Sequence, residues 1–273
     1  MKALACALLS LAGAVHAASW QPERNVELIV GTAPGGGSDF LGPVLADGLR
    51  AQLKESVVVQ NLAGAGSVVG STHVAKAKPD GYTLLLNHIG LSTVPALYKK
   101  LQFDPLAAYE FVGLFAEAPM VIMARKEFAP KNYAELVAYA RQHREKFTMA
   151  SSGMGSSTHL CAIIFQQALG VPITIVQYKG AGPAVIDVRS GQVDAICDLP
   201  TTTSSQIRSG ELRGYVLTAP QRMASLPDAP TVAESGLTGY EALLFYCLVA
   251  PARTPRAIVI KISKDIARVL EMP

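Results

Sequence analysis

Short apolar strands alternate with helical stretches along most of the chain, and a turn rich in glycine or hydroxyl residues joins many of these pairs. Parallel strands joined by helical crossovers produce such an alternation, because each crossover helix covers one face of the sheet. We therefore expect an α/β fold with parallel sheets covered on both faces. The expected strands lie at 25–30, 56–60, 82–87, 147–150, 173–178, 193–199 and 212–218, and the expected helices at 39–53, 68–77, 133–144, 157–169, 184–190, 206–209 and 255–270.

The middle of the chain interrupts this alternation with one long apolar stretch. Residues 111–124 are almost continuously apolar and are broken at Pro119, which suits a pair of strands that cross between two domains. The first helix, 39–53, carries an apolar side made of Phe40, Leu41, Val44, Leu45 and Leu49. The pattern predicts two α/β units, with the polypeptide passing from one to the other near Pro119.

Composition excludes several classes of protein. Half of the 273 residues are hydrophobic and only 16% are charged, which is typical of a globular chain with a large core rather than of a disordered one. Lys and Arg total 24 against 21 Asp and Glu, and the charges are scattered along the chain. No basic face for nucleic acid and no polybasic membrane patch are expected from such a balance.

The first residues predict export. Lys2 precedes an apolar stretch over 3–15, and Val15-His16-Ala17 has the small-x-small pattern of a signal-peptide cleavage site. The apolar stretch is too short to span a bilayer. We therefore expect residues 1–17 to be a signal peptide, cleaved near Ala17, and the mature protein to be periplasmic.

The cysteines leave two possibilities open. Cys6 would leave with the signal peptide, and Cys161, Cys197 and Cys247 are widely spaced without a metal-ligand pattern. One pair could form a disulfide in an oxidising compartment, with the third thiol left over. Buried free thiols are the interpretation that we favour.

Several of the turns between strand and helix could hold an anion. The first, 33–39, reads Ala-Pro-Gly-Gly-Gly-Ser-Asp, and glycines allow the backbone N–H groups at a helix start to approach a ligand. A nucleotide triphosphate is not expected there, because Gly37 stands where a P-loop needs Lys. A second turn, 61–67, contains Gly64 and Gly66, which with Gly70 resemble a dinucleotide fingerprint. A dinucleotide is not expected, because no acidic residue lies at a strand end about twenty residues further on to bind the ribose.

Two further turns lie in the second half of the chain. Residues 151–159 add serine and threonine hydroxyls to the N–H groups of a helix start, and residues 178–184 add the cation of Lys179. A serine hydrolase using Ser152 or Ser156 with His159 is the alternative of another class. We consider it poorly supported, because the chain has no GxSxG elbow and no acidic partner for His159. Ligands of α/β sheets bind beyond the carboxyl ends of the strands, so binding is favoured over catalysis.

Taken together, these motifs identify a family. The chain resembles the tripartite tricarboxylate transporter receptors, the Bug-type extracytoplasmic solute-binding proteins, from its first residues to its last. The matching motifs are Ala33-Pro34-Gly35-Gly36 with Asp39, Asn61 with Gly64-Ala65-Gly66, Lys78-Pro79-Asp80-Gly81-Tyr82-Thr83, Gly153 with Gly155-Ser156 and His159, Tyr178-Lys179-Gly180-Ala181-Gly182-Pro183-Ala184, Gly191-Gln192-Val193-Asp194, Leu226-Pro227-Asp228-Ala229-Pro230-Thr231-Val232 with Glu234-Ser235-Gly236, and Ala250-Pro251-Ala252-Arg253-Thr254-Pro255.

The resemblance implies a type II periplasmic-binding-protein fold, in which two α/β domains joined by a hinge of crossing strands close on a ligand. We expect domain 1 at 18–119 and 228–273 and domain 2 at 120–227. The implied function is capture of a small organic acid, a di- or tricarboxylate, an acidic amino acid or an aromatic carboxylate. The acid is then delivered to the large and small subunits of a membrane permease, or alternatively to a sensor. Neither catalysis, a cofactor, a metal nor nucleic acid is implied, and we expect a monomer.

The same resemblance implies the ligand-binding residues. Carried onto the matching positions, they are Gly36, Gly37, Asp39, Ser92, Thr93, Ser152, Gly155, Ser156, His159, Lys179, Gly180 and Asp198. Two departures stand out. Gly42-Pro43 replaces the usual Ala-Arg, so we expect a kink in the first helix. Similar chains also continue beyond residue 273, so we expect domain 1 to be incomplete.

Overall fold

The computed structural model describes residues 20–236 and 243–272. The expected signal peptide over 1–17 and its cleavage near Ala17 lie outside these residues. Among the helices that the structure describes, none combines the length and the apolar character that a membrane span needs.

The first lobe is built on a five-stranded sheet in the order β2-β1-β3-β10-β4. Strands β1, β2 and β3 run parallel, whereas β10 is antiparallel to both β3 and β4. The strands are β1 (Val26–Val30), β2 (Val57–Asn61), β3 (Thr83–His88), β4 (Tyr109–Pro119) and β10 (Leu243–Pro251), and the helices are α1 (Gly37–Leu53), the short 3-10 helix η1 (Ala65–Ser67), α2 (Val68–Ala75), α3 (Gly90–Leu97) and α8 (Arg256–Leu270).

The second lobe repeats this plan with the order β7-β6-β8-β5-β9. Strands β6, β7 and β8 are parallel, and β5 is antiparallel to β8 and β9. The strands are β5 (Val121–Arg125), β6 (Thr148–Ser151), β7 (Thr174–Gln177), β8 (Ala195–Asp198) and β9 (Leu212–Leu217), and the helices are α4 (Tyr133–Gln142), α5 (Ser157–Leu169), α6 (Ala181–Ser190) and α7 (Pro200–Arg208).

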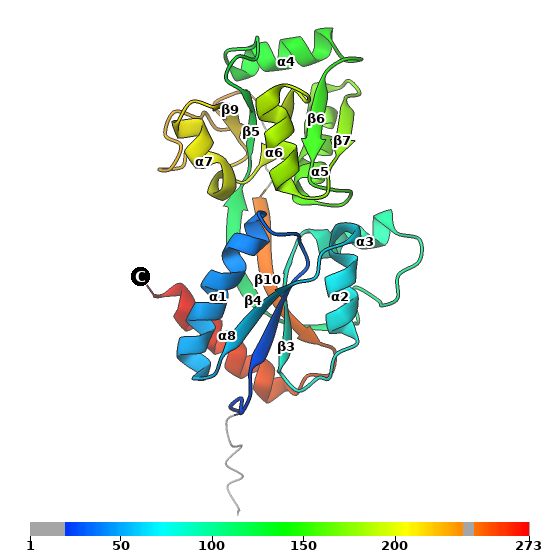
Figure 1. Cartoon of the computed structure of the whole chain (residues 1–273), viewed down its shortest axis with the longest axis vertical. Coiled ribbons are helices and arrows are strands. Elements are labelled where there is room, and N and C mark those ends of the chain that lie inside the picture. The colour runs from blue at the N-terminus through cyan, green and yellow to red at the C-terminus, as the bar shows by residue number, and fades with distance from the viewer. Residues whose placement is uncertain (1–19, 237–242, 273) are drawn as a thin grey trace, which may run out of the picture.

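Both sheets are therefore mixed, and the prediction of parallel sheets was wrong in this respect. The difference arises where the chain passes between lobes, because β4 and β5 follow one another almost directly and β10 enters the first sheet from the second lobe. Figure 1 shows the two lobes stacked along the long axis, with β4 and β10 side by side below the junction.

Met120 marks the crossing between the two sheets. It lies between the last residue of β4 and the first of β5 and is only 3% exposed. Its N–H donates to Thr218 Oγ1 over 2.8 Å, and the Thr218 N–H donates to the Met120 carbonyl oxygen over 2.9 Å. The crossing from β4 to β5 is thus hydrogen-bonded in both directions to the residue that follows β9.

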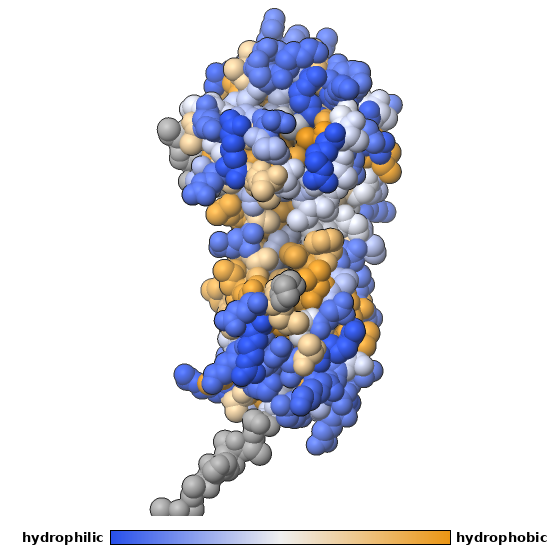
Figure 2. All heavy atoms as spheres, turned by 90° about the vertical axis from the view of Figure 1, so that its left-hand side faces the viewer, coloured by the Kyte–Doolittle hydropathy of each residue, from blue (hydrophilic) through white to orange (hydrophobic). Residues whose placement is uncertain are grey.

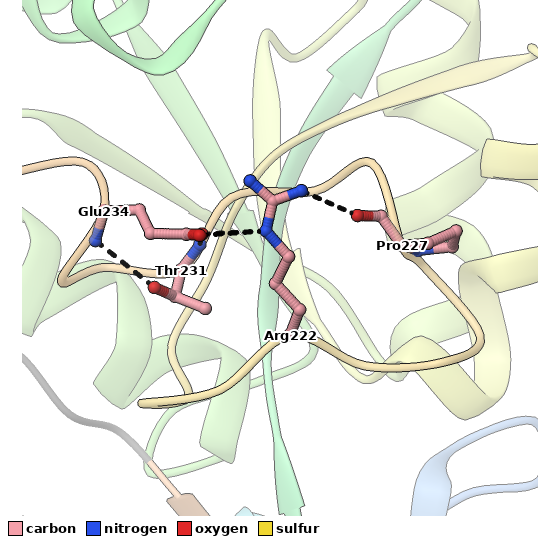
Figure 3. Close-up of polar contacts among 4 residues, drawn as sticks. All are labelled: Arg222, Pro227, Thr231 and Glu234. Atoms are coloured by element: carbon pink, nitrogen blue, oxygen red, sulfur yellow. Dashed lines mark hydrogen bonds and ion pairs between the residues drawn. The ribbon is translucent and has the colours of Figure 1, made fainter.

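A compact connector follows β9. Pro230 accepts a hydrogen bond from the Leu217 N–H, and the Val232 N–H donates to the Leu217 carbonyl, so the connector runs beside β9. The Arg222 guanidinium binds both oxygens of Glu234 and the carbonyl of Pro227 (Figure 3). The Thr231 N–H donates to Glu234, and the Thr231 hydroxyl accepts from the Glu234 N–H. Our domain limits stay a prediction, since residues 230–232 contact the second sheet although we assigned them to domain 1.

Helix α1 differs from its predicted orientation. Leu45 and Leu49 are fully buried, but Phe40 and Val44 are 55% and 49% exposed. The buried face is displaced around the helix from the predicted one, because it includes small residues such as Gly42, Ala46 and Gly48 in place of Phe40 and Val44. The helix is continuous through Pro43. Figure 2 shows apolar residues gathered near the waist on the face that lies to the left in Figure 1.

The cysteines also differ from the favoured interpretation. Cys161 on α5 and Cys197 on β8 form a disulfide, with Cα atoms 6.1 Å apart. Cys247 on β10 is a buried free thiol. The prediction of three free thiols was wrong, because packing of α5 against β8 brings together two residues that are 36 positions apart. Sequence spacing does not report that proximity.

Candidate functional site

A cavity of about 510 Å³ lies between the lobes, beyond the carboxyl ends of strands from both sheets. Segments from both lobes line it, together with His88, Tyr98, Asp198, Leu199, Leu244 and Tyr246. The lining segments are 31–33, 36–38 and 63–67 from the first lobe, and 152–154, 156–158 and 178–181 from the second. All four turns that the sequence singled out therefore contribute to one cavity.

The first turn presents backbone donors. Gly36 is the N-cap of α1 and makes no side-chain cap hydrogen bond, so N–H groups of the first helical turn lack a side-chain acceptor. Asp39 braces the turn from behind, since its carboxylate accepts from the Gly35 N–H and from Asn61 Nδ2, both over 2.9 Å. Gly36 and Gly37 line the cavity, whereas Asp39 does not.

Gly37 lies where the two lobes meet. A Cβ atom at this position would collide with Leu199 Cδ1 from the second lobe and with the Tyr246 hydroxyl. Gly66 is equally close to the second lobe, because a Cβ there would lie 2.6 Å from the carbonyl oxygen of Met154. Thr93 Oγ1 donates to the Gly90 carbonyl and also reaches the Gly155 carbonyl at 3.3 Å. The lobes are thus in direct contact around the cavity.

The second turn places a buried imidazole beside a serine. Ser67 Oγ lies 3.1 Å from His88 Nε2, and His88 Nδ1 accepts a hydrogen bond from the Gly90 N–H over 3.0 Å. Burial lowers the pKa of His88 to about 4, so the imidazole is neutral near pH 7. Both side chains belong to residues that line the cavity.

The turn before α5 holds a cluster of hydroxyls. Thr158 Oγ1 accepts from the Ser152 N–H over 2.7 Å and lies 2.9 Å from both the Ser152 and Ser156 hydroxyls. Ser156 caps α5 by accepting from the His159 N–H over 3.2 Å. This cluster supplies polar groups to the second-lobe side of the cavity.

His159 contacts the turn backbone rather than the serine hydroxyls. Its Nδ1 accepts from the Gly155 N–H over 3.2 Å, and burial lowers its pKa. The described residues show no hydrogen bond between this imidazole and the hydroxyl of Ser152 or Ser156. A nucleophile with its base is therefore not assembled here, as the hydrolase alternative would require.

The remaining second-lobe residues are a cation at the surface and an acid in the interior. Lys179 is exposed, and the neighbouring Gly180 faces Ala33 across the cavity, since a Cβ there would lie 3.6 Å from the Ala33 Cβ. Asp198 is only 3% exposed. Burial raises its pKa to about 6, although hydrogen bonds from the Leu199 N–H and the Thr202 hydroxyl act in the opposite direction.

The residues that the resemblance implied fall into two groups. Gly36, Gly37, Ser152, Ser156, Lys179, Gly180 and Asp198 line the cavity. Asp39, Thr93, Gly155 and His159 lie behind it, where they brace turns or link the lobes, and Ser92 is exposed outside it. Their role in binding a ligand stays a prediction for both groups.

Sequence reasoning missed several lining residues. Thr32, Ser67, His88 and Tyr246 were not proposed, although all four line the cavity. One signal could have found two of them, because Thr32 and His88 lie at the carboxyl ends of adjacent strands, β1 and β3. Over 20–236 and 243–272, no group of three or more His, Cys, Asp or Glu side chains is placed to hold a metal ion.

Comparison with known proteins gives one consistent family. The model of the tripartite tricarboxylate transporter family receptor matches residues 42–273. A UPF0065 protein of Agrobacterium vitis is 41% identical over 252 residues, which are 92% of this chain and 73% of that protein.

Solved structures agree with this match. The periplasmic binding protein BugD has a TM-score of 0.86 and 42% identity, over 92% of this chain and 84% of that one. MatC from Rhodopseudomonas palustris, solved with bound malate, has a TM-score of 0.86 and 33% identity, over 92% and 86% of the two chains. The expected two-lobed α/β fold of a periplasmic binding protein is confirmed.

Proposed function

The chain belongs to the tripartite tricarboxylate transporter receptor family, and from that premise we propose that it captures a small organic acid between its lobes and delivers it to a tripartite permease. The family and the fold are those of solute-binding receptors, which are not enzymes, and the family is periplasmic. MatC, a relative of the same fold, holds malate.

One observation carries the proposal. Helix starts from both lobes converge on a single cavity, with α1 on one side and α5 and α6 on the other. Helix N-termini carry partial positive charge and unpaired N–H groups, which favour a carboxylate. Neither Gly36 nor Gly180, the N-caps of α1 and α6, provides a side-chain acceptor for these groups. A bound carboxylate would supply that acceptor.

The size of the cavity suits the proposed ligands. A volume of about 510 Å³ falls in the range typical of small-molecule sites. It is compatible with a di- or tricarboxylate, an acidic amino acid or an aromatic carboxylate. Within this proposal, the turns at Gly36–Gly37 and Ser152–Ser156 hold one carboxylate from opposite sides, and Lys179 adds a cation at the rim.

Closure on the ligand and delivery are further parts of the proposal. We place the hinge at Met120, where the chain crosses from β4 to β5 and is hydrogen-bonded to Thr218 at the end of β9. Export with removal of residues 1–17, a monomeric state and docking onto a permease with large and small subunits complete the proposed pathway. These steps follow from the family, whose receptors serve tripartite transporters.

Titration calorimetry tests the binding step. Succinate, malate, citrate, adipate, glutamate and benzoate form the panel, and succinamide is the uncharged control. We expect saturable binding of at least one acid with one site per chain, and no binding of succinamide. If none of the acids binds, although the protein unfolds cooperatively when its melting is followed by circular dichroism, the proposal is overturned.

A further inference from the structure

Ser67 has an unusual backbone and an unused capping position. It is the N-cap of α2, yet its side chain makes no cap hydrogen bond, although serine is among the preferred N-cap residues for that bond. Its backbone is left-handed, with φ 79° and ψ 2°, a conformation that residues other than glycine rarely adopt. Such an outlier in the lining of a cavity points to a role in function.

His88 determines which atom of the pair donates. The Gly90 N–H donates to His88 Nδ1, so that nitrogen carries no proton in the neutral ring. The proton of the neutral imidazole is then on Nε2, which donates to Ser67 Oγ over 3.1 Å. Ser67 therefore accepts from His88, and its own hydroxyl hydrogen remains available for another acceptor.

Close packing holds this pair in place. A Cβ at Gly31 would lie 2.8 Å from the Ser67 Cβ, and a Cβ at Gly90 would lie 2.7 Å from His88 Cε1. The imidazole is almost completely buried, and Ser67 is 4% exposed. Among the described residues, His88 is the only hydrogen-bond partner of Ser67 Oγ. The available hydroxyl hydrogen thus belongs to a rigid group in the lining of the cavity.

We propose that Ser67 donates a hydrogen bond to a carboxylate oxygen of the bound acid, and that His88 is the positioning residue that directs this hydroxyl toward the ligand. The inference rests on the proposed function, since it names a contact within the same cavity. An ionised carboxylate oxygen is purely an acceptor, which matches a hydroxyl whose acceptor position His88 already occupies. Because the imidazole is neutral, the pair recognises the anion through hydrogen bonding rather than through a net charge.

The test begins with Ser67→Gly, measured by titration calorimetry with whichever acid of the panel binds the native protein most tightly. Glycine suits the left-handed backbone and removes only the hydroxymethyl group, so the variant should fold. We expect Kd to rise roughly 10- to 100-fold, as for a lost hydrogen bond to a charged group. The matched control is Ser71→Ala on α2, because Ser71 is fully buried and its hydroxyl has no partner. Its Kd should be unchanged.

Variants of His88 separate positioning from simple packing. Gln can place an amide N–H near the position of Nε2, so His88→Gln should retain affinity to within a few-fold. His88→Met has no donor and should weaken binding about as much as Ser67→Gly. In the double variant the two losses should not add, since His88 acts through Ser67. Additive losses would contradict the positioning role.

The outcomes distinguish this inference from the proposed function. If no acid of the panel binds the native protein, the proposed function fails and the inference fails with it. If an acid binds and Ser67→Gly binds it equally well, only the inference is overturned. If Ser67→Gly binds weakly while Ser71→Ala is unchanged, and His88→Gln but not His88→Met retains affinity, the inference is supported.

Discussion

The two lobes line the same cavity by different means. The first lobe uses backbone turns that approach closely, as at Gly31 and Gly66, and supports them with the buried neutral ring of His88. The second lobe uses side-chain hydroxyls centred on Thr158 and the buried acid Asp198. Behind this lining, the Cys161–Cys197 disulfide fixes the residue before Asp198. Close approach of glycine backbone is thus more prominent in the first lobe, and a cluster of hydroxyls is more prominent in the second.

This difference predicts where each lobe is vulnerable. The first lobe should tolerate little added volume at Gly31, Gly37 and Gly66, because atoms of other segments lie within 3 Å of the Cβ position at each of them. The second lobe should be sensitive to loss of its covalent and polar groups. Buried titratable groups also differ, since burial lowers the pKa of His88 and raises that of Asp198.

Reduction of the Cys161–Cys197 disulfide should have the largest effect. The bond closes a loop with a sequence separation of 36, for which the chain-entropy model gives about 4 kcal/mol of stabilisation. We expect the midpoint of urea denaturation of the second lobe to fall when a thiol reductant is added. Cys161→Ala/Cys197→Ala should be insensitive to the reductant, and Cys247→Ala should remain sensitive. An unchanged denaturation midpoint of the native protein after addition of the reductant would contradict the expected contribution of the disulfide to stability.

Asp198→Asn should have the next largest effect, on the pH dependence of stability. The folded pKa of about 6 lies above the ordinary value of 3.8, so the native state keeps a proton that the unfolded chain loses in this window. Stability from this group therefore falls as pH rises from about 4 to 6. The Asn variant has no such titration, so it avoids this loss of stability. Relative to the native protein, the difference in the free energy of unfolding from this source is about 3 kcal/mol at pH 7 and vanishes below pH 4.

His88 should act in the opposite direction over nearly the same window. Its folded pKa of about 4 lies below the ordinary value of 6.5, so its contribution to stability is lost as pH falls from about 6.5 to 4. Urea denaturation at several pH values should show Asp198→Asn becoming more stable relative to the native protein as pH rises. His88→Gln should become less stable relative to the native protein over the same range. If the two variants had profiles of the same slope, the contrast between the lobes would not hold.

Gly66→Ala should have the smallest effect of these, on ligand affinity. Its Cβ would lie 2.6 Å from the Met154 carbonyl oxygen of the other lobe, so full closure would require the lobes to separate slightly. We expect a roughly 10-fold rise in Kd by titration calorimetry. Gly35→Ala is the matched control, because Gly35 also has a positive φ, 89°, but has no atom within 4 Å of its Cβ position. Equal Kd values for the two variants would argue against closure at this contact.

Local patterns predicted most individual elements. The helix at 157–169 agrees with α5 residue for residue, since a serine cap and a left-handed glycine at 170 mark its ends. Helix α3 was not predicted, because it has only eight residues and contains Pro95. The exposure of Phe40 and the Cys161–Cys197 disulfide depend on how elements pack, which apolar spacing and cysteine spacing do not encode.

The sequence predicted which turns line the candidate site, but not which of their side chains face the cavity. Strand-to-helix position identified the segments around Gly36, Ser152 and Lys179 that line the cavity. It did not separate residues that face the cavity from those that brace it, such as Asp39 and His159. Ser67 was missed because its orientation depends on positive φ at three successive residues, Ala65, Gly66 and Ser67, two of which are not glycine.

The position of a bound acid in a crystal structure is the most direct test of a carboxylate site shared between the two lobes. The protein would be crystallised with the panel acid that binds most tightly. We expect one carboxylate within hydrogen-bonding distance of backbone N–H groups at 36–38 in the first lobe and of groups at 152–156 in the second. An acid bound outside the cavity, or held by one lobe alone, would contradict a carboxylate site shared between the two lobes.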